Sequence, residues 1–115
     1  MEAGALRSRV SFRKFVEVDD LHGGFTETAL AIRDRVAAEI SALAGRDLEL
    51  ARQVDPRASH LVTVRYWANY HDDLIGGRVQ AIWHDALKDR TLEVVEPPRE
   101  RVARTALAMI CKEAA

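Results

Sequence analysis

The sequence predicts one mainly β domain, and three observations support that prediction. Residues 59–67 alternate between apolar and polar side chains, with Val62 and Val64 on one face, as in a half-buried strand. Residues 78–83 and 91–95 form two further short β-rich runs, and turn-forming glycines, prolines and aspartates separate the runs. A chain of 115 residues, 48% of them hydrophobic, has apolar material for one modest core, which suits a single domain.

The first expected element is a strand within residues 7–18. Val10 and Phe12 face one way in an alternating pattern. The opposite face carries the basic side chains Arg7, Arg9 and Arg13. The phase of the alternation slips at Lys14 and Phe15, which indicates a bulge or a strand edge at that point. Residues 19–24, DDLHGG, combine acids with glycines and are expected to form a turn or a flexible loop.

The stretch from residue 26 to residue 43 fits two patterns. Ile32, Val36 and Ile40 recur at helical spacing, and the alanines and charges favour a helix on propensity. The same apolar residues also fit a period of two, with Asp34 as the exception. Local evidence favours the helix and leaves a strand as the alternative.

The remaining elements are shorter. Residues 46–54 predict a short helix that ends before Pro56. Residues 69–77, NYHDDLIGG, predict a loop, and Pro97–Pro98 argues against regular strand pairing there, with residues 97–104 forming a hairpin connection. Residues 105–112 are apolar and predict a strand or a helix.

The net charge and the cysteine content argue against several classes of protein. The formal net charge of -1 argues against a free nucleic-acid binder or a membrane-surface protein. Cys111 is the one cysteine, so no intrachain disulfide can form and a reducing environment is expected. No apolar run is long enough to span a membrane, and the N-terminus lacks the apolar region of a signal peptide. These features predict a protein made in the cytoplasm.

Catalytic and metal sites are not predicted. The imidazole of His71 and the carboxylates of Asp72 and Asp73 could hold a cation. The sequence has no further ligand at a defined spacing that would complete such a site. Cys111 lies in an apolar run without a neighbouring base, which indicates a core residue and not a nucleophile. We therefore expect neither an enzyme nor a bound cofactor.

Two groups of residues each allow two readings. The basic face at Arg7, Arg9 and Arg13 is either solvated or directed at an acidic partner or a DNA channel. Trp67, beside Arg65, is either an exposed interface anchor or part of the core.

The glycine pairs of residues 23–24 and 76–77 are expected to adopt positive φ in turns.

The order of the motifs resembles the phage head–tail joining proteins, also called head–tail adaptors or head-closure stoppers. The matching segments are AGALRSRVSF, DDLHGGF, AAEISALAGRDLELARQ, SHLVTVRYW and LAMICKEA. Within them the family pattern is met at Gly4, Leu6, Arg7, Arg9, Val10, Asp19, Asp20, Gly23, Gly24, Gly45, Arg46, Asp47, Ala51, Arg65, Tyr66, Cys111 and Glu113. The sequence departs from the pattern at Ala37, where the family often has a tryptophan, and at EPPRER, where it usually has a glycine-containing hairpin.

The resemblance implies a fold and a role. The fold would be a small antiparallel β-barrel or sandwich of about six strands with one short helix near residues 46–54, and residues 32–42 would be a strand. The role would be a virion neck subunit, assembled in the bacterial host cytoplasm and forming a homo-oligomeric ring, commonly of twelve copies, between portal or adaptor and tail. Such a ring closes the DNA-filled head, joins the tail and touches packaged DNA transiently; the particle would be a phage or a phage-like gene transfer agent.

On this reading the contact residues form two sets. The expected subunit or partner interface comprises Arg46, Asp47, Glu49, Arg52, Arg65 and Trp67. The loops expected to face the channel or the tail comprise Asp19, Asp20, His22, Gly23, Gly24, Tyr70, His71, Asp72, Gly76 and Gly77. The alternative function is a small cytoplasmic DNA- or protein-binding regulatory module.

Overall fold

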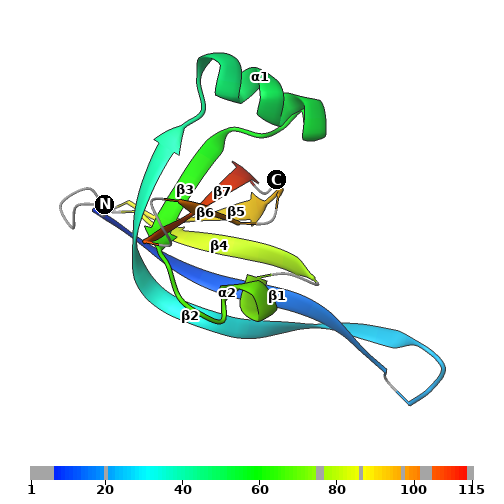
Figure 1. The fold of residues 1–115 in the computed structure, drawn as a ribbon. Coiled ribbons are helices and arrows are strands. Elements are labelled where there is room, and N and C mark those ends of the chain that lie inside the picture. The colour runs from blue at the N-terminus through cyan, green and yellow to red at the C-terminus, as the bar shows by residue number, and fades with distance from the viewer. Residues whose placement is uncertain are drawn as a thin grey trace.

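The computed structural model describes residues 7–19, 21–74, 77–85, 87–96, 98–101 and 105–113. Within those ranges the chain forms seven strands and two short helices (Figure 1). In chain order they are β1 (Ser8–Asp19), β2 (Phe25–Ala42), α1 (Gly45–Val54), β3 (His60–Arg65), α2 (Tyr70–Leu74), β4 (Arg78–His84), β5 (Asp89–Val94), β6 (Arg99–Arg101) and β7 (Ala106–Glu113). The prediction of a mainly β fold with a short helix near residues 46–54 is confirmed.

The strands form one antiparallel sheet whose pairings return to their starting point. The strand order is β3-β2-β1-β4-β5-β7-β6, and β3 also pairs with β7. Six strands therefore form a closed circuit, visible as a ring of strands in Figure 1. β6 is a seventh strand that lies beside β7, pairing Arg99 with Ala108 and Arg101 with Ala106. The expectation that the segment after Pro97 avoids regular pairing is therefore wrong for residues 99–101.

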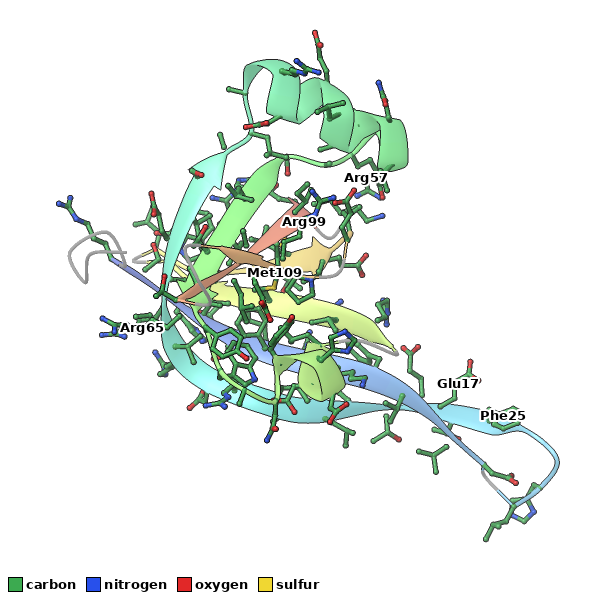
Figure 2. The ribbon with its side chains drawn as sticks, viewed as in Figure 1. Glu17, Phe25, Arg57, Arg65, Arg99 and Met109 are labelled. Atoms are coloured by element: carbon green, nitrogen blue, oxygen red, sulfur yellow. The ribbon has the colours of Figure 1, made fainter. Side chains whose placement is uncertain are left out.

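The core lies inside the circuit of strands and follows from the alternation of side chains. Val62 and Val64 of β3 are 0% and 1% exposed, and their partners Met109 and Leu107 on β7 are as deeply buried. Figure 2 shows Met109 in the middle of the ring. The other fully enclosed members are Val10, Phe12, Ala38, Ala81, Leu92 and Cys111. The predicted inward face of residues 59–67, with Val62 and Val64, is thus confirmed.

β2 resolves the ambiguous stretch as a strand. It pairs with β1 along most of its length and with β3 from Ala38 to Ala42. Ala38 is completely buried between these neighbours. β1 pairs with this segment as far as Ala38 and β3 pairs with it from Ala38 onward, so strand pairing outweighs the helix propensity of its alanines and charges. The locally favoured helix is wrong, and the strand implied by the resemblance is correct.

The irregularity of the β1–β2 pair lies in β2 and not at Lys14 and Phe15. The register shifts between Val10 and Phe12 and again between Phe12 and Arg13, where β2 has extra residues opposite β1. Arg35, in this bulged part of β2, has a φ of 49°. Lys14 and Phe15 keep regular pairing with both β2 and β4. The predicted bulge therefore exists, but a few residues away in the partner strand.

The segment of residues 69–77 contains α2, which the sequence did not predict. Leu74 is 3% exposed and joins the core cluster, and Tyr70 packs against that cluster, so both ends of this five-residue helix are anchored. Gly77 follows, and a Cβ atom there would lie 2.7 Å from the carbonyl oxygen of Phe15. Gly77 is therefore needed for close approach to β1, and not for the positive φ that was expected.

Candidate interaction surfaces

The outer part of the β1–β2 hairpin projects from the closed sheet. β4 pairs with β1 only from Val10 to Phe15, and β3 pairs with β2 only from Ala38 onward. Beyond the end of β4, residues 16–28 pair with each other, as far as Asp19 opposite Phe25. Figure 1 shows this two-stranded ribbon extending away from the ring of strands. We call residues 16–28 the arm.

The tip of the arm exposes large apolar side chains. Leu21 is 88% exposed and Phe25 is 72% exposed, while Val18 is 48% exposed. The tip also carries most of the first predicted loop: Asp19, His22, Gly23 and Gly24. Asp19 accepts a hydrogen bond on Oδ1 from the backbone N–H of Leu21 at 3.0 Å, and Gly23 has the expected positive φ of 85°. Asp20 lies outside the described residues.

α1 stands beside the sheet at the end of the molecule opposite the arm (Figure 1). A groove lies between the helix and the sheet. Only Ala51 of this helix is buried, whereas Leu50 is 50% exposed and Val54 is 60% exposed. The groove has a volume of about 360 Å³. Its apolar walls include Leu50 and Val54 of the helix and Leu61 and Ile110 of the sheet. Asp47, Glu96 and Arg99 also line it. We call this hollow the α1 groove.

The helix charges that were predicted as interface residues lie together on α1. Arg46, Asp47, Glu49 and Arg52 are all exposed. Asp47 lines the α1 groove, and Arg52 donates a long hydrogen bond, 3.5 Å from Nε, to the carbonyl of Ala58. A helix whose charges point outward and whose apolar residues line a groove can present both kinds of contact to a partner.

Arg65 and Trp67 belong to the same predicted interface, but both lie away from α1. Arg65 is exposed, whereas Trp67 packs against the core. Arg65 is exposed at the far end of β3 from the helix (Figure 2). Trp67 packs against the core, with its ring centroid 6.0 Å from that of Phe12 and the Arg33 guanidinium 4.9 Å above it. Its Nε1 donates a 2.8 Å hydrogen bond to Asp73 Oδ2. Of the two readings of Trp67, the structure favours core packing.

The second predicted loop set lies at the base of the arm. Tyr70 donates a 2.8 Å hydrogen bond from its hydroxyl to Glu100 Oε1, and Lys14 donates one of 3.1 Å to the carbonyl of Asp72. His71 and Asp72 have exposed side chains, and Gly77 follows at the start of β4. These contacts fix the α2 segment to β1 and β6, well away from the arm tip. Gly76 lies outside the described residues, as do Gly4 and Leu6 of the family pattern.

The basic face at the start of β1 is only partly exposed. Arg7 and Arg9 are exposed. Arg13 donates hydrogen bonds of 2.9 and 2.6 Å from Nε and Nη2 to Gln80 Oε1, and its guanidinium lies 5.4 Å from the centroid of Phe15. Arg13 therefore contributes to packing at the edge of the core, and Arg9 and Arg7 remain as surface cations.

A row of serine, histidine and aspartate crosses β1, β4 and β5. Ser11 Oγ lies 2.7 Å from His84 Nε2, and His84 Nδ1 lies 3.1 Å from Asp89 Oδ1. Ser11 also donates a 2.9 Å hydrogen bond to Asp34 Oδ1 and accepts one of 3.0 Å from the Arg35 N–H. Because the hydroxyl proton is directed at Asp34, this geometry braces the β2 bulge and does not activate Ser11 as a nucleophile.

Burial shifts the pKa of two side chains of the sheet, Cys111 and His60. Cys111 is completely buried, as expected for a core residue, and burial raises the pKa of its thiol to about 12. Burial, followed by the positive charge of Arg90, lowers the pKa of His60. Within the ranges the structure describes, no group of three or more His, Cys, Asp or Glu side chains is placed to hold a metal ion. Across those same ranges, no helix is long and apolar enough to cross a membrane.

Comparison with known proteins identifies the family. The sequence pattern of the phage head completion proteins matches residues 1–114. The chain belongs to this family. It therefore has a structural role in a phage head and works in contact with other virion components. The resemblance to head-joining and head-closure proteins is confirmed, and the family is one of structural proteins, not of enzymes.

A solved structure supports the fold independently. The solution structure of protein SF1141 from Shigella flexneri 2a is similar to the chain, with a TM-score of 0.69. The similarity covers 100% of this chain and 98% of that one, at 20% sequence identity. At this identity the likeness shows a shared fold. No curated protein matches the sequence.

Proposed function

We propose that the chain is a ring-forming neck subunit that closes the DNA-filled head and joins it to the tail. The observation that carries the proposal is the match of the head completion family to residues 1–114. A head that has been filled with DNA has one opening left, at the vertex through which DNA entered. A protein that completes such a head acts at that vertex, where the tail also attaches.

The shape of the subunit supports ring formation. A ring of identical subunits uses a heterologous interface, in which two different patches of each copy meet. The arm and the α1 groove are two such patches at opposite ends of the molecule (Figure 1). We propose a closed ring, of twelve copies as in related neck proteins, whose subunits contact the portal or adaptor on one side and the tail on the other.

We assign the α2 segment, residues 69–74, to the side of the ring that faces the channel or the tail. The α2 segment, with His71 and Asp72 exposed and Leu74 buried, is a fixed surface suited to face the channel or the tail. The net charge of -1 suits a channel wall that touches DNA transiently and does not retain it. The same role would serve an infectious phage or a phage-like gene transfer agent.

The test is deletion of the gene in the strain that produces the particles, followed by negative-stain electron microscopy of the lysate. The expected result is tailless heads beside free tails, with heads that have lost their DNA. Restoring the intact gene on a plasmid should restore tailed particles. Tailed, DNA-filled particles in normal numbers after deletion would overturn the proposal.

A further inference from the structure

Two arginines lie side by side on the outer face of the sheet, where β1, β2 and β3 meet. Arg9 of β1 pairs with Ala37 of β2. Arg65 of β3 lies on the other side of Ala37, because Val64, the residue before it, pairs with Ala38. Val64 and Ala38 are buried in the core, so the next residues along these strands point outward. Figure 2 shows Arg65 outside the ring of strands. Arg9 and Arg65 therefore flank one small side chain.

A third arginine joins this pair. Arg35 lies two residues before Ala37 in the bulged part of β2 and is exposed, as are Arg9 and Arg65. Its backbone is fixed, because its N–H donates a 3.0 Å hydrogen bond to Ser11 Oγ. Two strand spacings, about 10 Å, separate the backbones of Arg9 and Arg65, and their long side chains can reach a shared ligand above Ala37. We call Arg9, Arg35 and Arg65 the arginine face.

The guanidinium groups of the arginine face have no acceptor among the residues that the structure describes. None of the three forms an ion pair or a hydrogen bond there. Other arginines of the sheet differ in this respect, since Arg78 and Arg90 each contact a glutamate. The hydrogen-bonding capacity of the arginine face is therefore left for a ligand.

The positive charge of the arginine face exceeds that of the carboxylates around it. Asp34 and Glu39 border the face on β2, and Asp34 already accepts a 2.9 Å hydrogen bond from a serine hydroxyl. Asp89, on β5, lies 3.1 Å from a histidine nitrogen of β4. Two further exposed arginines, Arg7 and Arg33, flank the face. Residues 7–11, 33–39 and 65 thus contain five arginines and two acidic residues, so the net charge of this surface is positive.

The composition of the face indicates the chemistry of its partner. Guanidinium groups match the geometry of phosphate oxygens and bind them through paired hydrogen bonds. Contacts between proteins have an apolar centre instead. Among the described residues, none of the exposed large apolar side chains lies within residues 7–11, 33–39 or 63–65. A cationic surface without an apolar centre suits a phosphodiester backbone, which proteins contact mainly through charge.

We infer that the arginine face binds the phosphodiester backbone of double-stranded DNA, with Arg9 and Arg65 on either side of one phosphate. The inference rests on the proposed function, in which the subunit meets the DNA of a filled head, and it names the surface that makes this contact. Arg33 joins that surface to the α2 segment, because its guanidinium lies 4.9 Å from the ring centroid of Trp67, whose Nε1 donates to Asp73 of α2. A ring repeats the face in every copy, so contacts that are weak in one subunit add together.

The first test is binding of the purified full chain to a fluorescently labelled DNA duplex, measured by fluorescence anisotropy. The salt concentration is varied from about 50 to about 200 mM, because phosphate contacts weaken steeply over this range. The triple variant Arg9→Gln, Arg35→Gln, Arg65→Gln should bind about tenfold or more weakly at the lowest salt concentration. The slope of log affinity against log salt should become shallower by about 3, one for each lost contact.

A second triple variant is the matched control. Arg46→Gln, Arg57→Gln and Lys88→Gln remove the same charge from exposed residues away from the arginine face and should leave the salt slope nearly unchanged. Circular dichroism establishes that both triple variants are folded. Equal weakening of binding in the two variants would show only general attraction and would overturn the inference. Absence of DNA binding by the parent chain at the lowest salt concentration would overturn it as well.

The same assay separates DNA from an acidic protein as the partner. A labelled polyglutamate with the same total charge as the duplex is the probe. The parent chain should bind the duplex more tightly, because carboxylates of a flexible chain do not present the fixed row of charge that a duplex carries. Tighter binding of polyglutamate, lost in the arginine-face variant, would assign the surface to an acidic protein and overturn the inference.

The outcomes also separate this inference from the proposed function. If deletion of the gene abolishes tail joining but the arginine-face variant binds DNA as the parent chain does, the neck function holds and the DNA contact is overturned. If deletion leaves particles normal, the neck function falls, and the binding of purified protein to the duplex still decides for or against the DNA contact.

Discussion

Lys112 Nζ donates a 2.8 Å hydrogen bond to Asp55 Oδ2, and this contact joins the residue that follows α1 to the last strand of the closed sheet. Asp55 also accepts a 2.8 Å hydrogen bond on Oδ1 from the backbone N–H of Arg57. The helix that forms one wall of the α1 groove is thus held at its C-terminal end by one carboxylate.

The first prediction concerns the pH dependence of this contact. The hydrogen bond from Lys112, and then that from Arg57, lowers the pKa of Asp55 below its ordinary value of 3.8. A carboxyl with a depressed pKa in the folded state adds stability that is present above the unfolded pKa and is lost as the pH falls through the folded one. Asp55→Asn should therefore lower the free energy of unfolding at neutral pH and flatten its decline below pH 4. Urea unfolding across this range measures both.

The control for Asp55 is a double-mutant cycle with Lys112→Gln. Asparagine keeps an oxygen that can accept the Arg57 N–H, so the comparison isolates the charge. The double variant should be no less stable than the worse single variant. Full additivity would show that the two side chains do not interact in solution.

The second prediction concerns Cys111, the only cysteine of the chain. Because the thiol is completely buried and its pKa is raised to about 12, a thiol-specific chromogenic reagent should not label the native protein at pH 8. Denaturant should release one reactive thiol per chain. Stability should fall as the pH rises from 9 towards 12, because the unfolded state ionises first. Rapid labelling of the native protein would contradict the buried position.

The third prediction concerns Gly77. Gly77→Ala would place a Cβ 2.7 Å from a backbone oxygen of Phe15, which is too close for any side-chain adjustment to relieve. The expected cost is about 1–3 kcal/mol, the range for overpacking a well-packed site. Thermal unfolding measures it. Gly23→Ala is the comparison, because nothing lies within 4 Å there and only its φ of +85° resists substitution. An unchanged Gly77→Ala protein would mean that the backbone at Gly77 does not lie this close to Phe15 of β1.

The fourth prediction concerns Trp67 and Asp73. Trp67→Phe keeps much of the packing against Phe12 but removes the Nε1 donor, which leaves Asp73 without that hydrogen bond. We expect a loss of about 1–3 kcal/mol in the free energy of unfolding. Asp73→Asn retains an acceptor oxygen and should lose less. If both variants match the parent protein, the hydrogen bond contributes nothing to stability.

The strands that alternate cleanly could be predicted from the sequence, and the one that bulges could not. Val62 and Val64 alternate with polar neighbours because β3 has one face in the core throughout. In β2 the extra residues around Asp34 and Arg35 break the period of two, so Asp34 stood out as an exception to the strand pattern. The helix propensity of its alanines then dominated, because no local signal reports the pairing with β1 and β3.

The exposure of surface residues could be predicted only in part. The charges of α1 are exposed, as charged residues on a short helix are in most packings. The exposure of Phe25 in the arm, and of Leu50 and Val54 beside the groove, was not predicted. Their exposure depends on how far the arm extends beyond β4 and on how α1 stands beside the sheet. The apolar residues on both sides of DDLHGG were the only local sign of the arm tip.

The closed circuit of strands sets the order of events during folding. Val10 pairs with Trp83, and β7 supplies partners to β3, β5 and β6. The circuit cannot close until β7 has been synthesised. Until then, the side chains of the earlier strands that will form the core remain exposed to water. Pairings between residues so distant in the chain make folding slow, on the order of milliseconds to seconds. A chain that lacks the last strand therefore lacks the neighbour of both β3 and β5 and cannot enclose the core.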